Sequence, residues 1–124
     1  MISLNTISLP DDLIWADEFG WTPVRQNQDV SLSGALIVEE AAQQKGRPIT
    51  LTGNDEVWAT RATIEALYAL AQQPATPMAL TLHDRTFSVL FRHGEGALEA
   101  QPVVAHSNPD ASTYYTLTLR LIEI

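Results

Sequence analysis

The chain has 124 residues, of which 45% are hydrophobic and 18% are charged, and these values are typical of one folded domain with its own core. Fifteen acidic residues against seven basic ones give a net charge of −8, which disfavours binding to nucleic-acid phosphates and to anionic membrane surfaces. The absence of cysteine excludes disulfides, zinc–thiolate sites and cysteine nucleophiles.

The chain begins with two segments of different character. Residues 2–9 alternate weakly between apolar and polar side chains and predict a β-strand that ends at Pro10. Residues 11–21 place large apolar side chains among four carboxylates, and they predict a structured loop or a short strand. The first residues lack the basic and long apolar regions of a signal peptide, so we expect a protein made in the cytoplasm.

The next segments predict a β-hairpin with a long tip. Residues 30–40 are rich in apolar and β-branched side chains and predict a strand, with Gly34 at an internal bulge or at a close approach of the backbone. Residues 48–52 predict the antiparallel return strand, which a turn at residues 53–55 ends. The polar residues 41–47 between the strands would then form the hairpin tip.

One amphipathic helix is expected at residues 60–73. Apolar side chains recur there at helical spacing and form one stripe, which consists of Ile64, Leu67, Tyr68 and Ala71. Thr60 is a suitable N-cap, and Pro74 prevents the helix from continuing. We therefore expect Leu67 to face the core.

The last third of the chain predicts strands again. Residues 78–91 predict a tight hairpin with its turn at residues 83–85. Residues 97–105 predict a strand at an edge or with a bulge, because Pro102 cannot donate a hydrogen bond to a central ladder. Residues 114–124 alternate regularly and predict a strand locked into the sheet. Together, the elements predict an α+β fold in a single domain over residues 1–124, with mainly antiparallel sheets, a long β-hairpin and one packed α-helix.

The sequence predicts no catalytic or metal site and no cofactor. The histidines lie in predicted turns or at strand ends without metal-ligand spacing, and they are His83, His93 and His106. A cluster of carboxylates lacks the ligand spacing and central glycine of a calcium loop, and it comprises Asp11, Asp12, Asp17 and Glu18. Nucleotide-binding and acyl-transfer motifs are missing as well. We therefore expect a protein that is not an enzyme.

Two groups of residues are candidates for a protein–protein interface. The first consists of Trp15, Phe19 and Trp21, since tryptophan is enriched at interface centres and the nearby carboxylates would supply a polar rim. The alternative for these aromatic side chains is packing over an open edge of the core. The second group is at the expected hairpin tip and consists of Gln44, Lys45 and Arg47.

Several segments together resemble small tail proteins of long-tailed bacteriophages and prophages. These segments are the Leu-Pro-Asp-Asp-Leu-Ile-Trp entry at residues 9–15 with the following Asp17-Glu18-Phe19 and Trp21, the strand at 35–40, residues 46–51, Trp58 before the helix, the hairpin ending in Phe91-Arg92-His93, and the terminal residues 115–122. The chain most resembles the ring-forming N-terminal domain of distal tail proteins, which join the tail tube to the baseplate hub.

The resemblance implies a β-sandwich-like sheet system and a virion structural protein that forms a homo-oligomeric ring, most simply a hexamer. The implied partners are other copies of the chain and the neighbouring tail tube and hub proteins, with localisation in the virion tail. DNA would pass through the lumen without being bound. Many distal tail proteins carry a second, carbohydrate-binding-like domain, for which these 124 residues leave no room, so we expect only the ring role, and not receptor or sugar binding, to carry over.

Two other classes of function stay open at this point. A small acidic adaptor module without catalytic activity would use acidity and exposed aromatic side chains equally well. A hydrolase of unrecognised geometry would need a concave pocket with converging polar groups. Self-association separates the first alternative from the ring, because a ring subunit assembles and an adaptor stays monomeric or dimeric.

Overall fold

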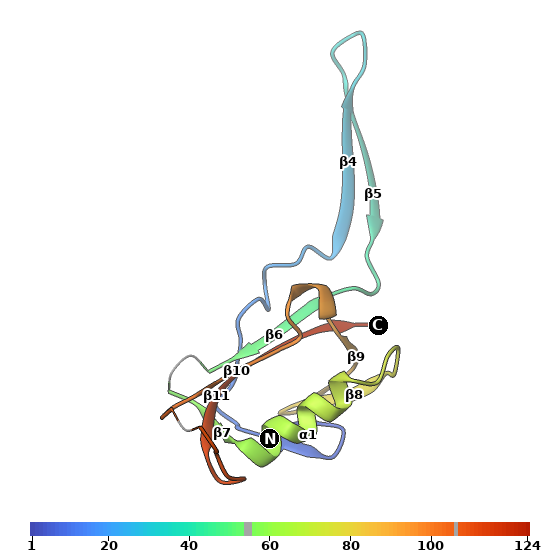
Figure 1. The fold of residues 1–124 in the computed structure, drawn as a ribbon. Helices are drawn as coiled ribbons and strands as arrows, with labels where there is room; N and C mark the ends of the chain where they lie inside the picture. The colour runs from blue at the N-terminus through green and yellow to red at the C-terminus, as the bar shows by residue number, and fades with distance from the viewer. Residues whose placement is uncertain (54–55, 106) are drawn as a thin grey trace.

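The computed structural model describes residues 1–53, 56–105 and 107–124. It consists of a body, in which one β-sheet carries a helix, and a two-stranded ribbon that projects from this body (Figure 1). The mostly antiparallel strands and the single α-helix of the described residues confirm the α+β fold class. No helix in the described part of the chain has the length and apolar character that a membrane crossing requires.

Nine strands of the described chain form one hydrogen-bonded sheet in which every pair is antiparallel. Their bounds in chain order are β1 (Ile2–Leu4), β2 (Ile7–Leu9), β3 (Ile14–Trp15), β6 (Pro48–Thr52), β7 (Trp58–Thr60), β8 (Met78–Leu82), β9 (Arg85–Phe91), β10 (Leu98–Pro102) and β11 (Tyr114–Glu123). The spatial order runs β2-β1-β8-β9-β11-β6-β3.

The last strand, β11, is the centre of the sheet. It pairs with β6 and β7 along one edge, and with β9 and β10 along the other. Its alternation is the predicted one, since every second side chain is buried, namely Tyr115, Leu117, Leu119 and Leu121. Period-two alternation sends these side chains to one face of the sheet, where they meet the rest of the core.

The helix α1 (Arg61–Ala71) follows β7 directly and contacts β2, β7, β10 and β11. Leu67 is completely buried, as the apolar stripe predicts, whereas Tyr68 of the same stripe is exposed. Thr60 occupies the N-cap position, but its hydroxyl contacts the Thr63 hydroxyl at 3.2 Å and makes no capping bond to a backbone N–H. The helix is therefore held mainly by packing of its buried face.

The prediction of one strand over residues 2–9 is wrong, because the chain folds back on itself there. Asn5 has a φ of 53°, a left-handed conformation that asparagine tolerates, and it turns β1 into β2. In one continuous strand Leu4 and Leu9, five positions apart, would point to opposite faces. The turn brings both into the core together with Ile2.

The prediction that residues 30–40 pair with residues 48–52 is also wrong. The real hairpin is formed by β4 (Val24–Val30) and β5 (Leu36–Ala42), and Gly34 lies at its tip with a φ of 86°, not at a bulge. Residues 48–52 form β6, which pairs with β11 and β3. The reason is burial: β6 places Ile49 and Leu51 in the core, whereas β5 is exposed along its length.

The C-terminal half otherwise follows the predicted pattern. The hairpin of β8 and β9 turns at His83 and Asp84, and Arg85 already belongs to β9. The strand β10 pairs with β11 alone among the described strands and ends at Pro102, in agreement with an edge position. The short 3₁₀ helix η1 (His93–Glu95) connects β9 to β10. Two residues of the expected turn at 53–55, Asn54 and Asp55, and the histidine at position 106 lie outside the described residues.

Candidate protein–protein interface

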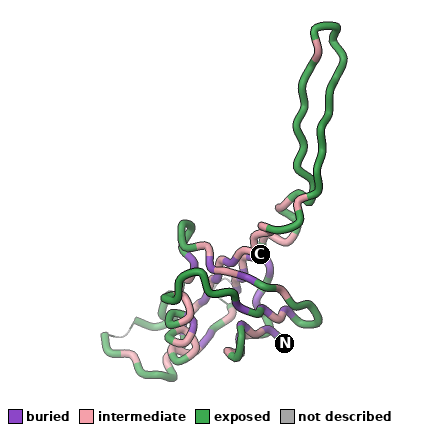
Figure 2. The backbone as a smooth tube through the Cα atoms, turned by 90° about the vertical axis from the view of Figure 1, so that its right-hand side faces the viewer, coloured by how far each residue is buried: buried purple, intermediate pink, exposed green. Residues whose placement is uncertain are grey.

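The most conspicuous feature of the surface is the projecting ribbon, residues 24–42, which we name the arm. Its two strands contain seven residues each, and every residue of both strands is exposed (Figure 2). At about 3.4 Å per residue, the strands extend for roughly 24 Å. An isolated two-stranded hairpin is at best marginally stable in water, so the arm is a structure that a partner would stabilise.

The register of the arm separates its side chains into two faces. Directly paired residues of antiparallel strands point to the same side, and successive residues alternate. The first face, which we name the apolar face, carries Val24, Gln26, Gln28, Val30, Leu36, Val38, Glu40 and Ala42. The second, which we name the polar face, carries Arg25, Asn27, Asp29, Ile37, Glu39 and Ala41. The arm is thus amphipathic although neither face is covered.

The two faces differ most toward the tip. There the apolar face pairs Val30 with Leu36 and Gln28 with Val38, and it carries no charge. Its only charged residue, Glu40, lies nearer the base and accepts a hydrogen bond from Gln26 Nε2 at 2.5 Å. Exposed contiguous apolar surface of this kind marks protein contact sites in soluble proteins.

The tip itself is a defined turn. Ser31 donates its N–H to the Ala35 carbonyl at 2.8 Å and accepts the Ala35 N–H on its hydroxyl at 3.1 Å. Gly34 supplies the left-handed conformation, which residues with a Cβ adopt only with strain. Leu32 projects from this turn and is fully exposed. The turn therefore presents one more large apolar side chain at the far end of the arm.

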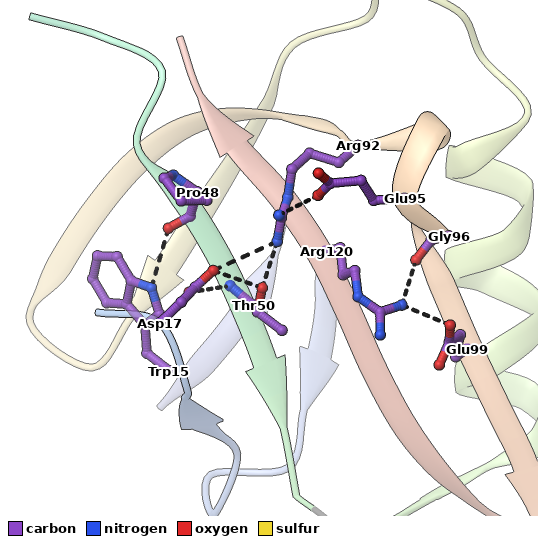
Figure 3. Close-up of polar contacts among 9 residues, drawn as sticks. All are labelled: Trp15, Asp17, Pro48, Thr50, Arg92, Glu95, Gly96, Glu99 and Arg120. Atoms are coloured by element: carbon purple, nitrogen blue, oxygen red, sulfur yellow. Dashed lines mark hydrogen bonds and ion pairs between the residues drawn. The ribbon is translucent and has the colours of Figure 1, made fainter. Parts of the chain in front are cut away.

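The base of the arm is fixed to the body where the chain leaves it. Asp17 accepts the Thr50 N–H on Oδ1 and the Thr50 hydroxyl on Oδ2, both at 2.8 Å (Figure 3). Arg92 approaches the same carboxylate at 3.7 Å, also donates to the Thr50 hydroxyl, and forms an ion pair with Glu95 at 2.6 Å. This network joins the departing chain to β6 and to the end of β9.

A second group of contacts, which we name the Trp15 cluster, fixes the base where the chain returns. The guanidinium carbons of Arg47 and Arg85 lie 4.5 and 5.2 Å from the centre of the Trp15 ring. Phe87 contacts that ring edge to face at a centroid distance of 5.5 Å. Both arginines also bind Glu18: Arg47 donates to its carbonyl, and Arg85 forms an ion pair with its carboxylate at 2.9 Å. Cation–π and ionic contacts thus hold the segments before and after the arm against each other and against β9.

The predicted aromatic candidates separate into different roles. Trp15 is only 7% exposed and belongs to the core, so the alternative of core packing is the correct one for this side chain. Phe19 is 90% exposed and Trp21 is partly exposed, and both precede the arm near its base. Only these two remain candidates for contact with a partner.

The polar candidates do not lie at a hairpin tip. Gln44 and Lys45 are exposed at the base of the arm, because the hairpin that places them at a tip does not form. Arg47 is partly buried in the Trp15 cluster. The residues that occupy the tip were missed by sequence reasoning, although Ser33-Gly34 is a recognised turn signal and identifies the correct position.

The described residues contain no group of three or more histidine or acidic side chains placed to hold a metal ion. Among the described residues, two groups have shifted pKa values, and each shift comes from hydrogen bonds that the group makes. A hydrogen bond to the Tyr115 hydroxyl at 2.6 Å raises the pKa of Arg61. Hydrogen bonds from the hydroxyl and N–H of Ser112 and from the Thr113 hydroxyl lower the pKa of Asp110. Comparison with known proteins finds no matching family model, curated relative or solved structure.

Proposed function

We propose that this chain is a structural subunit of a bacteriophage tail, which assembles into a closed homo-oligomeric ring between tail tube and baseplate. In this proposal the apolar face of the arm is a contact between neighbouring subunits. The single observation that carries it is the projecting amphipathic arm, whose apolar side chains have no place in the core of their own chain. An antiparallel sheet, one packed helix and a long hairpin support the family resemblance, and sandwich-like packing of the sheet is part of the same proposal.

The energy of such a contact is of the right order for assembly. Burial of a valine or leucine side chain contributes about 1.5–3 kcal/mol. Val24, Val30, Leu36 and Val38 lie on one face of the arm and are 38–71% exposed in the single chain, so docking would gain about half of that amount for each. Association costs an estimated 4–15 kcal/mol in lost translational and rotational freedom, so the arm supplies part of the driving force and other contacts supply the rest.

The charge of the chain fits a channel for DNA. When the apolar face is docked, the polar face with Asp29 and Glu39 stays in water. Carboxylates on the wall of a lumen repel DNA phosphates, so DNA slides past without binding. The net charge of −8 per chain also makes subunits repel one another, and salt screens this repulsion. We expect the ring to assemble more readily as ionic strength rises.

The experiment that tests the proposal is a measurement of mass by sedimentation and light scattering across a salt series, with electron microscopy of the assembled fraction. The variant Leu36→Ser removes an apolar side chain from the apolar face, and Ile37→Ser is its matched control. The two residues are neighbours in one exposed strand, but Ile37 lies on the polar face. We expect the first variant to prevent ring formation and the second to leave it intact.

A strictly monomeric wild-type protein at high concentration and high salt contradicts the ring. In that case the adaptor function becomes the better interpretation, with the arm as the surface that binds a different protein. Equal effects of the two serine variants would contradict the assignment of the apolar face.

A further inference from the structure

A second apolar surface lies on the body, and we name it the end patch. It consists of four exposed large apolar side chains, Trp58 of β7, Val103 and Val104 after β10, and Tyr114 at the start of β11. The Trp58 and Tyr114 rings contact each other with centroids 5.9 Å apart. The patch surrounds a hollow of about 390 Å³, whose rim also includes Asp110, Ser112 and Thr113.

The backbone holds the end patch in place. Thr116 of β11 pairs with Trp58, and Tyr114 pairs with Thr60, so both aromatic residues belong to adjacent paired strands. The N–H of Val103 donates to the Tyr114 carbonyl at 3.1 Å, which continues the pairing beyond β10. The hollow is therefore built on the sheet.

The exposed large apolar side chains of the described residues are concentrated in two places. The arm carries Val24, Val30, Leu32, Leu36, Ile37 and Val38, and the end patch carries Trp58, Val103, Val104 and Tyr114. The remaining exposed ones are scattered singly along the chain, namely Met1, Ile14, Phe19, Tyr68 and Ile124. Scattered apolar side chains are ordinary on protein surfaces, whereas contiguous patches mark contact sites.

The two surfaces lie at opposite ends of the molecule. The arm is joined to the C-terminal end of β11, where Glu123 exchanges backbone hydrogen bonds of 2.9 Å with Gly46 and Arg47. The end patch lies at the other end of this strand, beside Tyr114, and a strand of ten residues is about 30 Å long. The arm extends away from the body on the side opposite to β7 and the start of β11 (Figure 1). It therefore does not reach the end patch of its own chain.

We propose that the end patch receives the apolar face of the arm from a second copy of this chain. This inference rests on the proposed self-assembly and names the surface that takes the arm. A contact between two different surfaces at opposite ends is heterologous, so each copy has one arm to give and one patch to fill, and repetition closes a ring when the rotation allows it.

The chemistry of the two surfaces is compatible. Both are largely apolar, and the distal part of the apolar face carries Val30, Leu36 and Val38 without a charge. The carboxylate on the rim of the hollow, Asp110, is already held by hydrogen bonds from Ser112 and Thr113. Docking by the apolar face directs Asp29 away from this carboxylate, because Asp29 lies on the polar face. Docking by the polar face would place two carboxylates close together and is disfavoured.

The first test uses substitutions in the full-length protein. Val104→Asp places a carboxylate in the end patch at a side chain that is 62% exposed, so the fold of the monomer is not at risk. Tyr68→Asp is the matched control, since Tyr68 is 59% exposed on α1 outside the end patch. We expect Val104→Asp to raise the dissociation constant of self-association about 30-fold or more, the effect of losing a hot-spot contact. The Tyr68→Asp variant should assemble like the wild type.

The second test uses the absence of cysteine, which makes each introduced thiol unique. Single variants Gln28→Cys and Val104→Cys are mixed and treated with a short thiol-specific cross-linker, because Gln28 lies on the distal apolar face beside Val38 and its replacement removes no apolar side chain. The control mixture is Ile37→Cys with Val104→Cys. We expect a dimer-sized product that contains one chain of each variant from the first mixture, and much less of it from the control.

Three outcomes decide the inference. Weaker assembly in Val104→Asp together with selective cross-linking supports it. If Leu36→Ser prevents assembly while Val104→Asp does not, and the cross-link is absent, the arm docks elsewhere, and the proposed ring survives without this contact. A wild-type protein that stays monomeric under every salt condition overturns both the ring and its end-patch contact.

Discussion

Truncation of Trp15 tests whether this residue belongs to the core or to an interface. Loss of a core side chain lowers the free energy of unfolding of the single chain, whereas loss of an exposed interface side chain hardly changes it. The Trp15 side chain is 7% exposed, whereas that of Phe19, four positions further on, is 90% exposed. Replacement of a buried tryptophan by alanine typically destabilises a protein by 3–5 kcal/mol, through lost transfer energy and the cavity that remains. Trp15→Ala also removes the edge-to-face contact with Phe87 and the contacts of two arginines with the ring. We therefore expect a destabilisation toward the upper end of that range.

We therefore expect Trp15→Ala to lower the free energy of unfolding by about 4–5 kcal/mol and Phe19→Ala to lower it by less than about 0.5 kcal/mol. With a urea m-value of about 2 kcal/mol/M, the first change shifts the unfolding midpoint by roughly 2 M. Equilibrium urea unfolding at low protein concentration and low salt measures this without a contribution from assembly. Equal shifts in the two variants would refute the division between a core tryptophan and a surface phenylalanine.

Three further predictions concern the body. An added Cβ at Gly53 would lie 2.2 Å from the Cβ of Val57, so Gly53→Ala should destabilise the fold by about 1–3 kcal/mol, whereas Gly94→Ala, with open space around it, should be nearly neutral in thermal unfolding. The lowered pKa of Asp110 means that its ionised form stabilises the folded loop above the unfolded pKa of about 3.9, and that this contribution is lost as the pH falls through the lowered value. A carboxyl titration followed by NMR should show this shift, and Ser112→Ala, which removes the hydroxyl with the largest effect, should move the pKa back upward. A chelator should leave the unfolding midpoint unchanged, and a drop of more than about 4 °C would indicate a bound metal.

Local patterns predicted the elements whose stability depends on near neighbours or on one alternating face. The helix was found because its stripe repeats at helical spacing, and Leu67 is buried where the stripe places it. The last strand was found because its buried residues alternate over ten positions. The hairpin around His83 was found because its strands and its turn are contiguous in sequence.

Pairing between distant segments was the part that local patterns could not predict. Residues 36–40 and residues 48–52 both look like strands, and proximity favours pairing them with each other. In the structure β6 instead pairs with β11, and the register joins Leu51 to Leu119 across about 70 positions of the chain. β6 pairs with β11 because both strands bury their apolar side chains in the same core. The sequence of one segment alone does not show which other segment will share that core.

The candidate site, like the fold, was predicted only in part from the sequence. The sequence by itself determined that the chain is acidic, free of cysteine and without a recognisable catalytic motif, and that aromatic residues gather before the arm. Only the tertiary structure decided that Trp15 belongs to the core and that Arg47 and Arg85 lie on its ring. The same holds for the arm, because its apolar side chains differ from core residues in nothing but their surroundings. Val38 and Val89 are the same residue type on a β-strand, yet Val89 is completely buried in the core, whereas Val38 is 44% exposed on the arm.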